Sequence, residues 1–267
     1  MVKKAIIPAA GYGTRGLPIT KVLPKEMFPI GTKPAIEYVV EEAIESGIES
    51  ILIIVSKTKS LIIDYFDYSL ELEAYLEKNN KTHLLEKVKR LDIKIYYTRQ
   101  PYARGLGDAI RLGKEFVGDD PFAVLLPDDI ILGEKGCGLG ELVKVYQDTK
   151  SSVVGLKKVE PHLLENYGVI KGTEMKTDLF EVKDIIEKPK SNPPSDLAVI
   201  GRYIFTPEII SCLENLPPGV GGEIQLTDAI QKLLQNEKCY GQIIAGERFD
   251  IGTESGYIHL LKTIFDT

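Results

Sequence analysis

The chain of 267 residues is long enough for one large domain with a substantial hydrophobic core, alone or with a subdomain. Its hydrophobic fraction of 43% and its charged fraction of 27% are typical of an ordinary globular protein. The formal net charge of −6 argues against general binding of nucleic acid or membrane surfaces, and no apolar run approaches the roughly 20 residues of a membrane span.

The N-terminal segment predicts a buried strand followed by a loop that binds an anion. An apolar run at 4–10 ends in small residues, and Gly11 and Gly13 then leave backbone N–H groups open to a phosphate oxygen. The segment that follows holds one acid, Glu26, against four bases: Arg15, Lys21, Lys25 and Lys33. In a protein of negative net charge, this local excess of positive charge predicts a site for a nucleoside triphosphate.

The spelling Gly-x-Gly-x-x-Gly at 11–16 also matches the dinucleotide-binding fingerprint, but its context argues against that interpretation. The fingerprint needs a helix that starts at the glycines. Three prolines prevent a continuous helix here: Pro18, Pro24 and Pro29. The second apolar run, 51–55, ends without the acid that would hold the ribose, and no Gly-Lys-Ser/Thr completes a P-loop. A plain turn with solvated lysines remains the alternative for the loop taken alone.

Apolar runs alternate with helical patterns along the rest of the chain, which predicts βαβ units around a parallel sheet. Helices are expected from Pro34 to a stop at Gly47, at 58–90, 106–116, 139–149, 207–214 and 225–235, and from 254 onward. Strands are expected at 51–55, 93–98, 122–126, 152–159, 179–187, 197–205 and 240–245. The predicted fold is a three-layer α/β domain with a Rossmann-like, mostly parallel sheet, helices on both faces, and an inserted β-rich part at about 160–205.

Two acids lie where the rule for α/β sheets places ligands, beyond the carboxyl ends of the strands. Asp128 follows the strand at 122–126, and Asp250 lies at a turn farther along the chain. Carboxylate oxygens beside a triphosphate predict a Mg²⁺ site, although ordinary Asx turns fit either position taken alone. Two interpretations of Lys188 also remain: a cation that binds the substrate, or a solvated surface lysine.

The remaining candidate residues predict no nucleophile or metal chemistry of their own. The three cysteines are scattered without metal-site spacing, so we expect a reduced cytoplasmic protein. The segment Met1–Lys4 leads into a strand without the apolar stretch of a signal peptide. His83, His162 and His259 have no neighbouring His or Cys and are not expected to act in catalysis.

Several short segments together carry a resemblance to a known enzyme family. They are GYGTRGLPITKVLPKEMFPI at 11–30, Arg99-Gln-Pro with Gly105-Leu-Gly107, Leu126-Pro-Asp-Asp129, Tyr167-Gly-Val-Ile170, Glu187-Lys-Pro189, Gly201-Arg-Tyr203, Gly222-Glu-Ile-Gln-Leu-Thr-Asp-Ala-Ile230 and Arg248-Phe-Asp-Ile-Gly252. Over nearly its whole length the chain resembles bacterial and archaeal UTP–glucose-1-phosphate uridylyltransferases. Other sugar-phosphate nucleotidyltransferases share the opening motif, whereas Pro-Lys-Glu-Met and Glu-Ile-Gln-Leu-Thr-Asp-Ala-Ile are more specific to the uridylyl branch.

The resemblance implies transfer of a uridylyl group from UTP to glucose-1-phosphate with Mg²⁺, in a homodimer or homotetramer. It places the nucleotide against Ala9, Ala10, Gly11, Gly13, Gln100 and Gly105, with Gln100 at the uracil edge. It places the glucose against Gly168, Glu187 and Tyr203. It assigns the phosphates to Arg15, Lys25 and Lys188, and Mg²⁺ to Asp128 and Asp250. The sugar phosphate would attack the α-phosphorus in line with the departing pyrophosphate, and as a dianion it would need no general base.

Two departures from the family pattern bear on specificity. Gly16 stands where the family usually has a bulky apolar residue, which would loosen the loop, and Asp108 replaces the usual His, which adds negative charge near the nucleotide. A thymidylyltransferase would share the loop, the metal site and the mechanism. A non-catalytic nucleotide-sugar sensor would be expected to lose a metal carboxylate or Lys188, and this chain keeps them.

Overall fold

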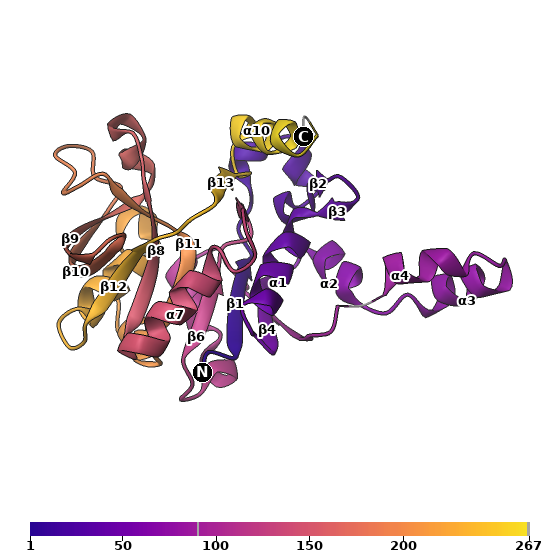
Figure 1. Ribbon diagram of the computed structural model, residues 1–267, viewed down its shortest axis with the longest axis horizontal. Helices are drawn as coiled ribbons and strands as arrows, with labels where there is room; N and C mark the ends of the chain where they lie inside the picture. The colour runs from indigo at the N-terminus through magenta and orange to yellow at the C-terminus, as the bar shows by residue number, and fades with distance from the viewer. Residues whose placement is uncertain (90, 266–267) are drawn as a thin grey trace.

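The computed structural model describes residues 1–89 and 91–265, and most strands of this part of the chain form one nine-stranded mixed sheet (Figure 1). One half of the sheet holds four parallel strands, in the spatial order β5 (Lys94–Arg99), β4 (Ser50–Val55), β1 (Lys4–Ala9) and β6 (Phe122–Leu125). The other half continues with β11 (Leu197–Phe205), β8 (Ser152–Lys158), β12 (Cys239–Ile243), β10 (Leu179–Glu187) and β9 (Gly168–Lys176).

The sheet is mixed rather than mostly parallel, which corrects this part of the sequence prediction. β11 runs antiparallel to both β6 and β8, and β10 runs antiparallel to both β12 and β9. A further bridge between Ala198 of β11 and Val169 of β9 closes this half into a small barrel. A short connection explains one of these antiparallel pairs, because parallel neighbours need a crossover of about a dozen residues or more. A two-residue turn joins β9 to β10, so these two neighbours run antiparallel.

Helices cover both faces of the sheet, as the sequence predicts. Successive strand residues point to opposite faces, so Ile7 of β1 packs with α1 (Ala35–Glu45) and α7 (Leu139–Thr149). Ile6 packs on the other side, with α5 (Leu106–Arg111), α8 (Glu208–Glu214) and α9 (Leu226–Leu233). The apolar residues of α1, among them Ile36 and Val40, are buried, and Gly47 beyond the end of this helix has a φ of +86°.

The long helical pattern at 58–90 is divided into α2 (Ser60–Phe66), α3 (Leu70–Lys78) and α4 (Leu85–Val88), and residue 90 lies outside the described residues. In Figure 1, α3 and α4 project far from the sheet. The pattern at 106–116 is divided into α5 and α6 (Lys114–Val117) at Gly113, where any Cβ would collide with Ile6. No helix within the described residues is both long enough and apolar enough to cross a membrane.

The segment after β1 contains no α-helix before α1, as its prolines predict. It folds into three 3-10 turns, η1 (Thr14–Gly16), η2 (Ile19–Lys21) and η3 (Lys25–Met27), and then the hairpin β2 (Pro29–Ile30) and β3 (Lys33–Pro34). Sequence reasoning missed this hairpin and β9, and it also missed the pairing of β7 (Asp129–Leu132) with β13 (Glu247–Asp250). That pairing sets Asp250 opposite Asp129, with α10 (Glu254–Phe265) following β13.

Candidate active site

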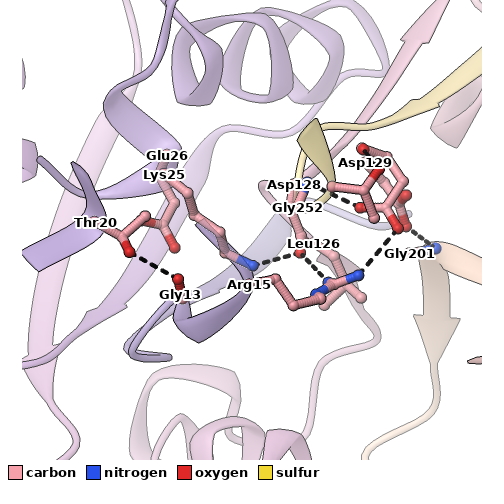
Figure 2. A network of polar contacts seen from close by, with 12 residues as sticks. Gly13, Arg15, Thr20, Lys25, Glu26, Leu126, Asp128, Asp129, Gly201 and Gly252 are labelled. Carbon is pink, nitrogen blue, oxygen red and sulfur yellow. Dashed lines mark hydrogen bonds and ion pairs between the residues drawn. The ribbon is translucent and has the colours of Figure 1, made fainter. Parts of the chain in front are cut away.

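The loop after β1 is held tightly at its two glycines. Gly13 has a φ of +66°, in the left-handed region that favours glycine, and its carbonyl accepts hydrogen bonds from Gly16 N at 2.9 Å and Thr20 Oγ1 at 2.8 Å (Figure 2). A Cβ on Gly16 would lie 2.7 Å from Thr20 Cγ2. Gly16 therefore lets Thr20 close the turn, and the loosening expected at this position is not what the contacts show.

Two basic and two acidic side chains from distant parts of the chain meet beside this loop (Figure 2). Lys25 donates a hydrogen bond to Asp128 Oδ2, and Arg15 lies 3.7 Å from the same oxygen and 3.4 Å from Asp250 Oδ2. The Gly252 amide donates to Asp250 Oδ1 at 2.9 Å, which turns the other carboxylate oxygen toward Arg15. The structure therefore brings together the two predicted metal ligands and two of the three predicted phosphate-binding cations, Arg15 and Lys25.

The charges of this cluster keep both of its central groups ionised. Burial would raise the pKa of Asp128, but Lys25 and Arg15 outweigh burial and hold this pKa below its ordinary value. Burial would lower the pKa of Lys25, but Asp128 and Glu26 outweigh it and raise this pKa. Asp128 is thus a carboxylate, the form that binds a cation.

The two carboxylates fit the demands of Mg²⁺. Within residues 1–89 and 91–265, no three or more His, Cys, Asp or Glu side chains form a cage that could enclose a metal. Asp128 and Asp250 line one cavity, and both lie beside Arg15. Mg²⁺ commonly takes only one or two carboxylates and completes its octahedron with waters and substrate phosphates, so this donor set suits it.

A cavity of about 190 Å³ extends from the two acids toward the ends of β10 and β9. The predicted sugar-binding residues line it together with Lys188: Gly168, Glu187 and Tyr203. Lys188 follows β10 with a φ of +46°, and its Nζ lies 2.9 Å from Glu187 Oε1. A Cβ on Gly168 would come within 2.8 Å of Thr227 Cγ2, so glycine keeps this wall close to α9.

A second cavity, of about 370 Å³, opens beyond the carboxyl end of β1. Its lining includes four of the predicted nucleotide-binding residues together with Lys25: Ala10, Gly11, Gln100 and Gly105. Ala9 and Gly13 are not brought to it, because the Ala9 side chain is buried in the core and Gly13 lies beneath Thr20. Gly105 has a φ of +98°, and a Cβ there would meet the Ile224 carbonyl at 2.8 Å.

The chain is similar to known nucleotidyl transferases over nearly its whole length. The family model for nucleotidyl transferases matches residues 4–266. The chain belongs to the nucleotidyl transferase family. It is 50% identical, over 96% of its length and 89% of the relative's, to a UTP–glucose-1-phosphate uridylyltransferase of Bacillus subtilis (strain 168).

Two solved structures of nucleotidyl transferases are similar to this chain throughout. One is a UDP-glucose pyrophosphorylase complexed with UDP-glucose, with a TM-score of 0.89 and 39% identity, covering 100% of this chain and 99% of that chain. The other is a UTP-bound UDP-glucose pyrophosphorylase from Acinetobacter baumannii, with a TM-score of 0.90 and 36% identity, covering 99% of this chain and 93% of that chain. The family resemblance seen in the sequence motifs is confirmed.

Sequence reasoning missed a buried arginine that supports the active site of this nucleotidyl transferase. Arg202 of β11 is fully buried and binds Glu42 of α1 through two nitrogens, at 2.7 Å from Nη2 to Oε2 and 2.9 Å from Nε to Oε1. It also donates to the carbonyls of Leu126 and Asp129, the residues that bracket the Pro127–Asp128 turn. Arg202 is the middle residue of the Gly-Arg-Tyr motif at 201–203, but the sequence spacing did not indicate a role for it.

A second missed network joins the neighbourhood of Asp128 and Asp250 to the cavity at the ends of β10 and β9. Arg248 Nε donates to Asp129 Oδ1 at 2.7 Å, and Arg248 Nη1 donates to the Tyr167 hydroxyl at 3.0 Å. The guanidinium also lies over the Tyr167 ring, 4.9 Å from its centroid. Asp129 in turn accepts the Gly201 amide at 2.9 Å. Arg248 therefore fixes the position of Tyr167, the residue before Gly168, relative to Asp129.

Sequence reasoning also missed the contacts of two further polar side chains. The buried Thr227 Oγ1 lines the cavity at the ends of β10 and β9 and has no hydrogen-bond partner within residues 1–89 and 91–265, which suits a ligand hydroxyl. The buried Glu26 accepts Lys59 Nζ at 2.8 Å on each carboxylate oxygen and so anchors η3, which carries Lys25. Burial lowers the pKa of Lys59 despite the attraction of Glu26.

Proposed function

We propose that this protein transfers the uridylyl group of UTP to glucose-1-phosphate, forming UDP-glucose and releasing pyrophosphate. One observation carries the proposal: the cluster of Lys25, Arg15, Asp128 and Asp250 joins the cavity beyond β1 to the cavity at the end of β10. A nucleoside triphosphate beyond β1 and a sugar phosphate at the end of β10 would meet at this cluster. The uridylyltransferase relative in Bacillus subtilis and the structures with UTP and UDP-glucose support the same reaction.

The chain's own residues supply positioning and positive charge. We assign Lys188 to the attacking sugar phosphate, which as a dianion needs no base, and Arg15 with Lys25 to the departing pyrophosphate. Mg²⁺ held by Asp128 and Asp250 would neutralise phosphate charge and polarise the α-phosphorus. Arg15 is 57% exposed and holds both acids only at 3.4 Å or more, so an arriving triphosphate can take over its guanidinium.

The assignments for the two ligands follow the two cavities. We assign the glucose to Gly168, Glu187 and Tyr203, with the segment at about 160–205 as the sugar-binding part. We assign the nucleotide to the loop after β1 and to Gln100 and Gly105, with Ala9 and Gly13 supporting the loop from behind. We also propose a homodimer or homotetramer, which light scattering of the purified protein measures.

The substrate pair is tested by pyrophosphate release from UTP, dTTP, ATP or NAD with a panel of sugar-1-phosphates. We expect UTP with glucose-1-phosphate to be preferred, and UTP to exceed dTTP by at least ~10-fold in kcat/KM. The reason is that a pocket separates one methyl group by about 1–3 kcal/mol, and a buried bond to the ribose 2′-hydroxyl adds to this. Preference for dTTP would assign the chain to the thymidylyl branch. Binding of UDP-glucose without turnover of any pair would indicate a sensor.

Lys188→Ala is expected to raise the KM for glucose-1-phosphate much more than the KM for UTP. The loss of one hydrogen bond to a charged group costs about 2 kcal/mol, or roughly 30-fold in kcat/KM for the sugar phosphate. Lys190→Ala removes the same charge two residues away from an exposed position and is the matched control. Equal kinetic constants for the Lys188 variant and the control would make Lys188 an ordinary surface lysine.

A further inference from the structure

Asp108 is the acid that departs from the family pattern, and its carboxylate is committed to two neighbours inside the protein. It lies in the first turn of α5 and is 4% exposed. Asp108 Oδ1 accepts Arg111 Nη2 at 2.7 Å, and Asp108 Oδ2 accepts Gln100 Nε2 at 2.8 Å. The charge predicted to perturb the nucleotide pocket is therefore paired with Arg111 and directed at Gln100.

The helix that carries Asp108 is held in a fixed position. Gly107 N donates to the Ile224 carbonyl at 2.9 Å, and a Cβ on Gly107 would lie 2.7 Å from that oxygen. The helix begins at Gly105, whose carbonyl also accepts Gln100 Nε2, at 3.3 Å. Both acceptors of the Gln100 amide nitrogen thus belong to one rigid turn.

These two acceptors decide which way the Gln100 amide faces. A carboxylate and a backbone carbonyl can only accept hydrogen bonds, so the amide nitrogen must point at them and the amide oxygen must point away. Gln100 is 5% exposed, and it lines the cavity beyond β1. In the described part of the chain, no donor is bonded to Gln100 Oε1. Gln100 therefore offers this cavity a hydrogen-bond acceptor.

We infer that Asp108, braced by Arg111, is a positioning residue that makes Gln100 select a pyrimidine base that carries a hydrogen on ring nitrogen N3. This inference rests on the proposed function, in which Gln100 meets the base. Uracil carries a donor at N3 between two carbonyl oxygens, whereas cytosine has an acceptor at N3. Gln100 Oε1 would accept a hydrogen bond from N3 of uracil, whereas it would face the lone pair on N3 of cytosine and repel it. Thymine has the same edge as uracil, so this arrangement separates UTP from CTP and not UTP from dTTP.

Asp108→Asn tests the inference because it leaves position 108 with one acceptor instead of two. The Arg111 cation claims that oxygen, which turns the new amide nitrogen toward Gln100 and favours a flipped Gln100 amide. We expect the ratio of kcat/KM for UTP to that for CTP to fall at least ~10-fold, since donor and acceptor are exchanged at a buried hydrogen bond. The KM for glucose-1-phosphate and the ratio of UTP to dTTP should stay as in the unmodified protein.

A second change predicts a rescue that a merely structural role would not produce. Arg111→Glu added to Asp108→Asn supplies an acceptor for the amide nitrogen at position 108, so its oxygen is free to accept Gln100 Nε2 again. We expect this double variant to regain UTP selectivity over CTP. The matched control is Asp119→Asn, which removes one negative charge from an exposed position after α6 and should leave the ratio unchanged.

Asp108→Ala keeps the test decisive if Asp108→Asn lowers the melting temperature too far for assay, because alanine is the strongest helix former. It removes the main constraint on the amide and should lower the UTP-to-CTP ratio partially. Thermal shifts with UMP and CMP report the same preference without turnover. An unmodified protein without uridylyl transfer would overturn the proposed function. A normal reaction with an unchanged UTP-to-CTP ratio in both Asp108 variants would overturn only this inference.

Discussion

Asp128→Ala is expected to lower turnover of UTP and glucose-1-phosphate by at least ~100-fold. Asp128 accepts Lys25, attracts Arg15, and is one of only two carboxylates that we assign to Mg²⁺. The loss of one preorganised charge at the reacting phosphates costs about 3 kcal/mol in the transition state. Initial rates of pyrophosphate release at saturating substrates measure the effect, with melting temperature as the check that the variant is folded.

Asp148→Ala is the matched control, because Asp148 lies on the exposed face of α7 and lines neither of the two cavities. It should retain full turnover. EDTA should abolish the activity of the unmodified protein, and added Mg²⁺ should restore it. Full activity without any divalent cation would contradict the metal assignment, and unchanged turnover of Asp128→Ala would remove this residue from the active site.

Arg202→Met is expected to lower the free energy of unfolding by about 3–5 kcal/mol, the cost of breaking a buried ion pair by removing one partner. Methionine fills much of the volume but donates no hydrogen bond. Glu42 then keeps its charge in the interior without a counter-ion, and the carbonyls of Leu126 and Asp129 lose their donors. Urea unfolding followed by circular dichroism measures the loss.

Two comparisons separate this mechanism from a general packing defect. Arg202→Met combined with Glu42→Gln should cost less than Arg202→Met alone, because no uncompensated charge remains and the glutamine can still accept the Leu139 amide. Arg99→Met at an exposed position of β5 should change stability by no more than about 0.5 kcal/mol. A loss of less than about 1 kcal/mol for Arg202→Met would show that the buried network contributes little.

The sequence predicted well those elements whose signal is local. Continuous apolar runs bounded by turn residues predicted β4, β6, β8 and β11, and the helical period of α1 ends at a glycine with positive φ. The strands β2 and β3 were missed because two residues cannot show a pattern, and β7 and β13 were missed because each includes charged residues and is not a continuous apolar run like β6. The mixed sheet was missed because the apolar patterns indicate which residues form strands, but not which strands pair or in which direction they run.

For the candidate site, the sequence by itself determined the residue types: a glycine loop with excess positive charge, acids after strands, and a family of motifs that the comparisons confirm. Each of these features can be recognised from residues that lie next to one another in the chain. Only the tertiary structure decided that Arg15 faces both acids, that Arg202 binds Glu42, and that Asp108 orients Gln100. The first two join residues 113 or more positions apart, as Arg15 and Asp128 or Arg202 and Glu42 show. Such pairs form only when packed strands and helices set side chains at hydrogen-bonding distance, and hydrogen bonds depend on angles and tenths of an ångström that no spacing in a sequence encodes.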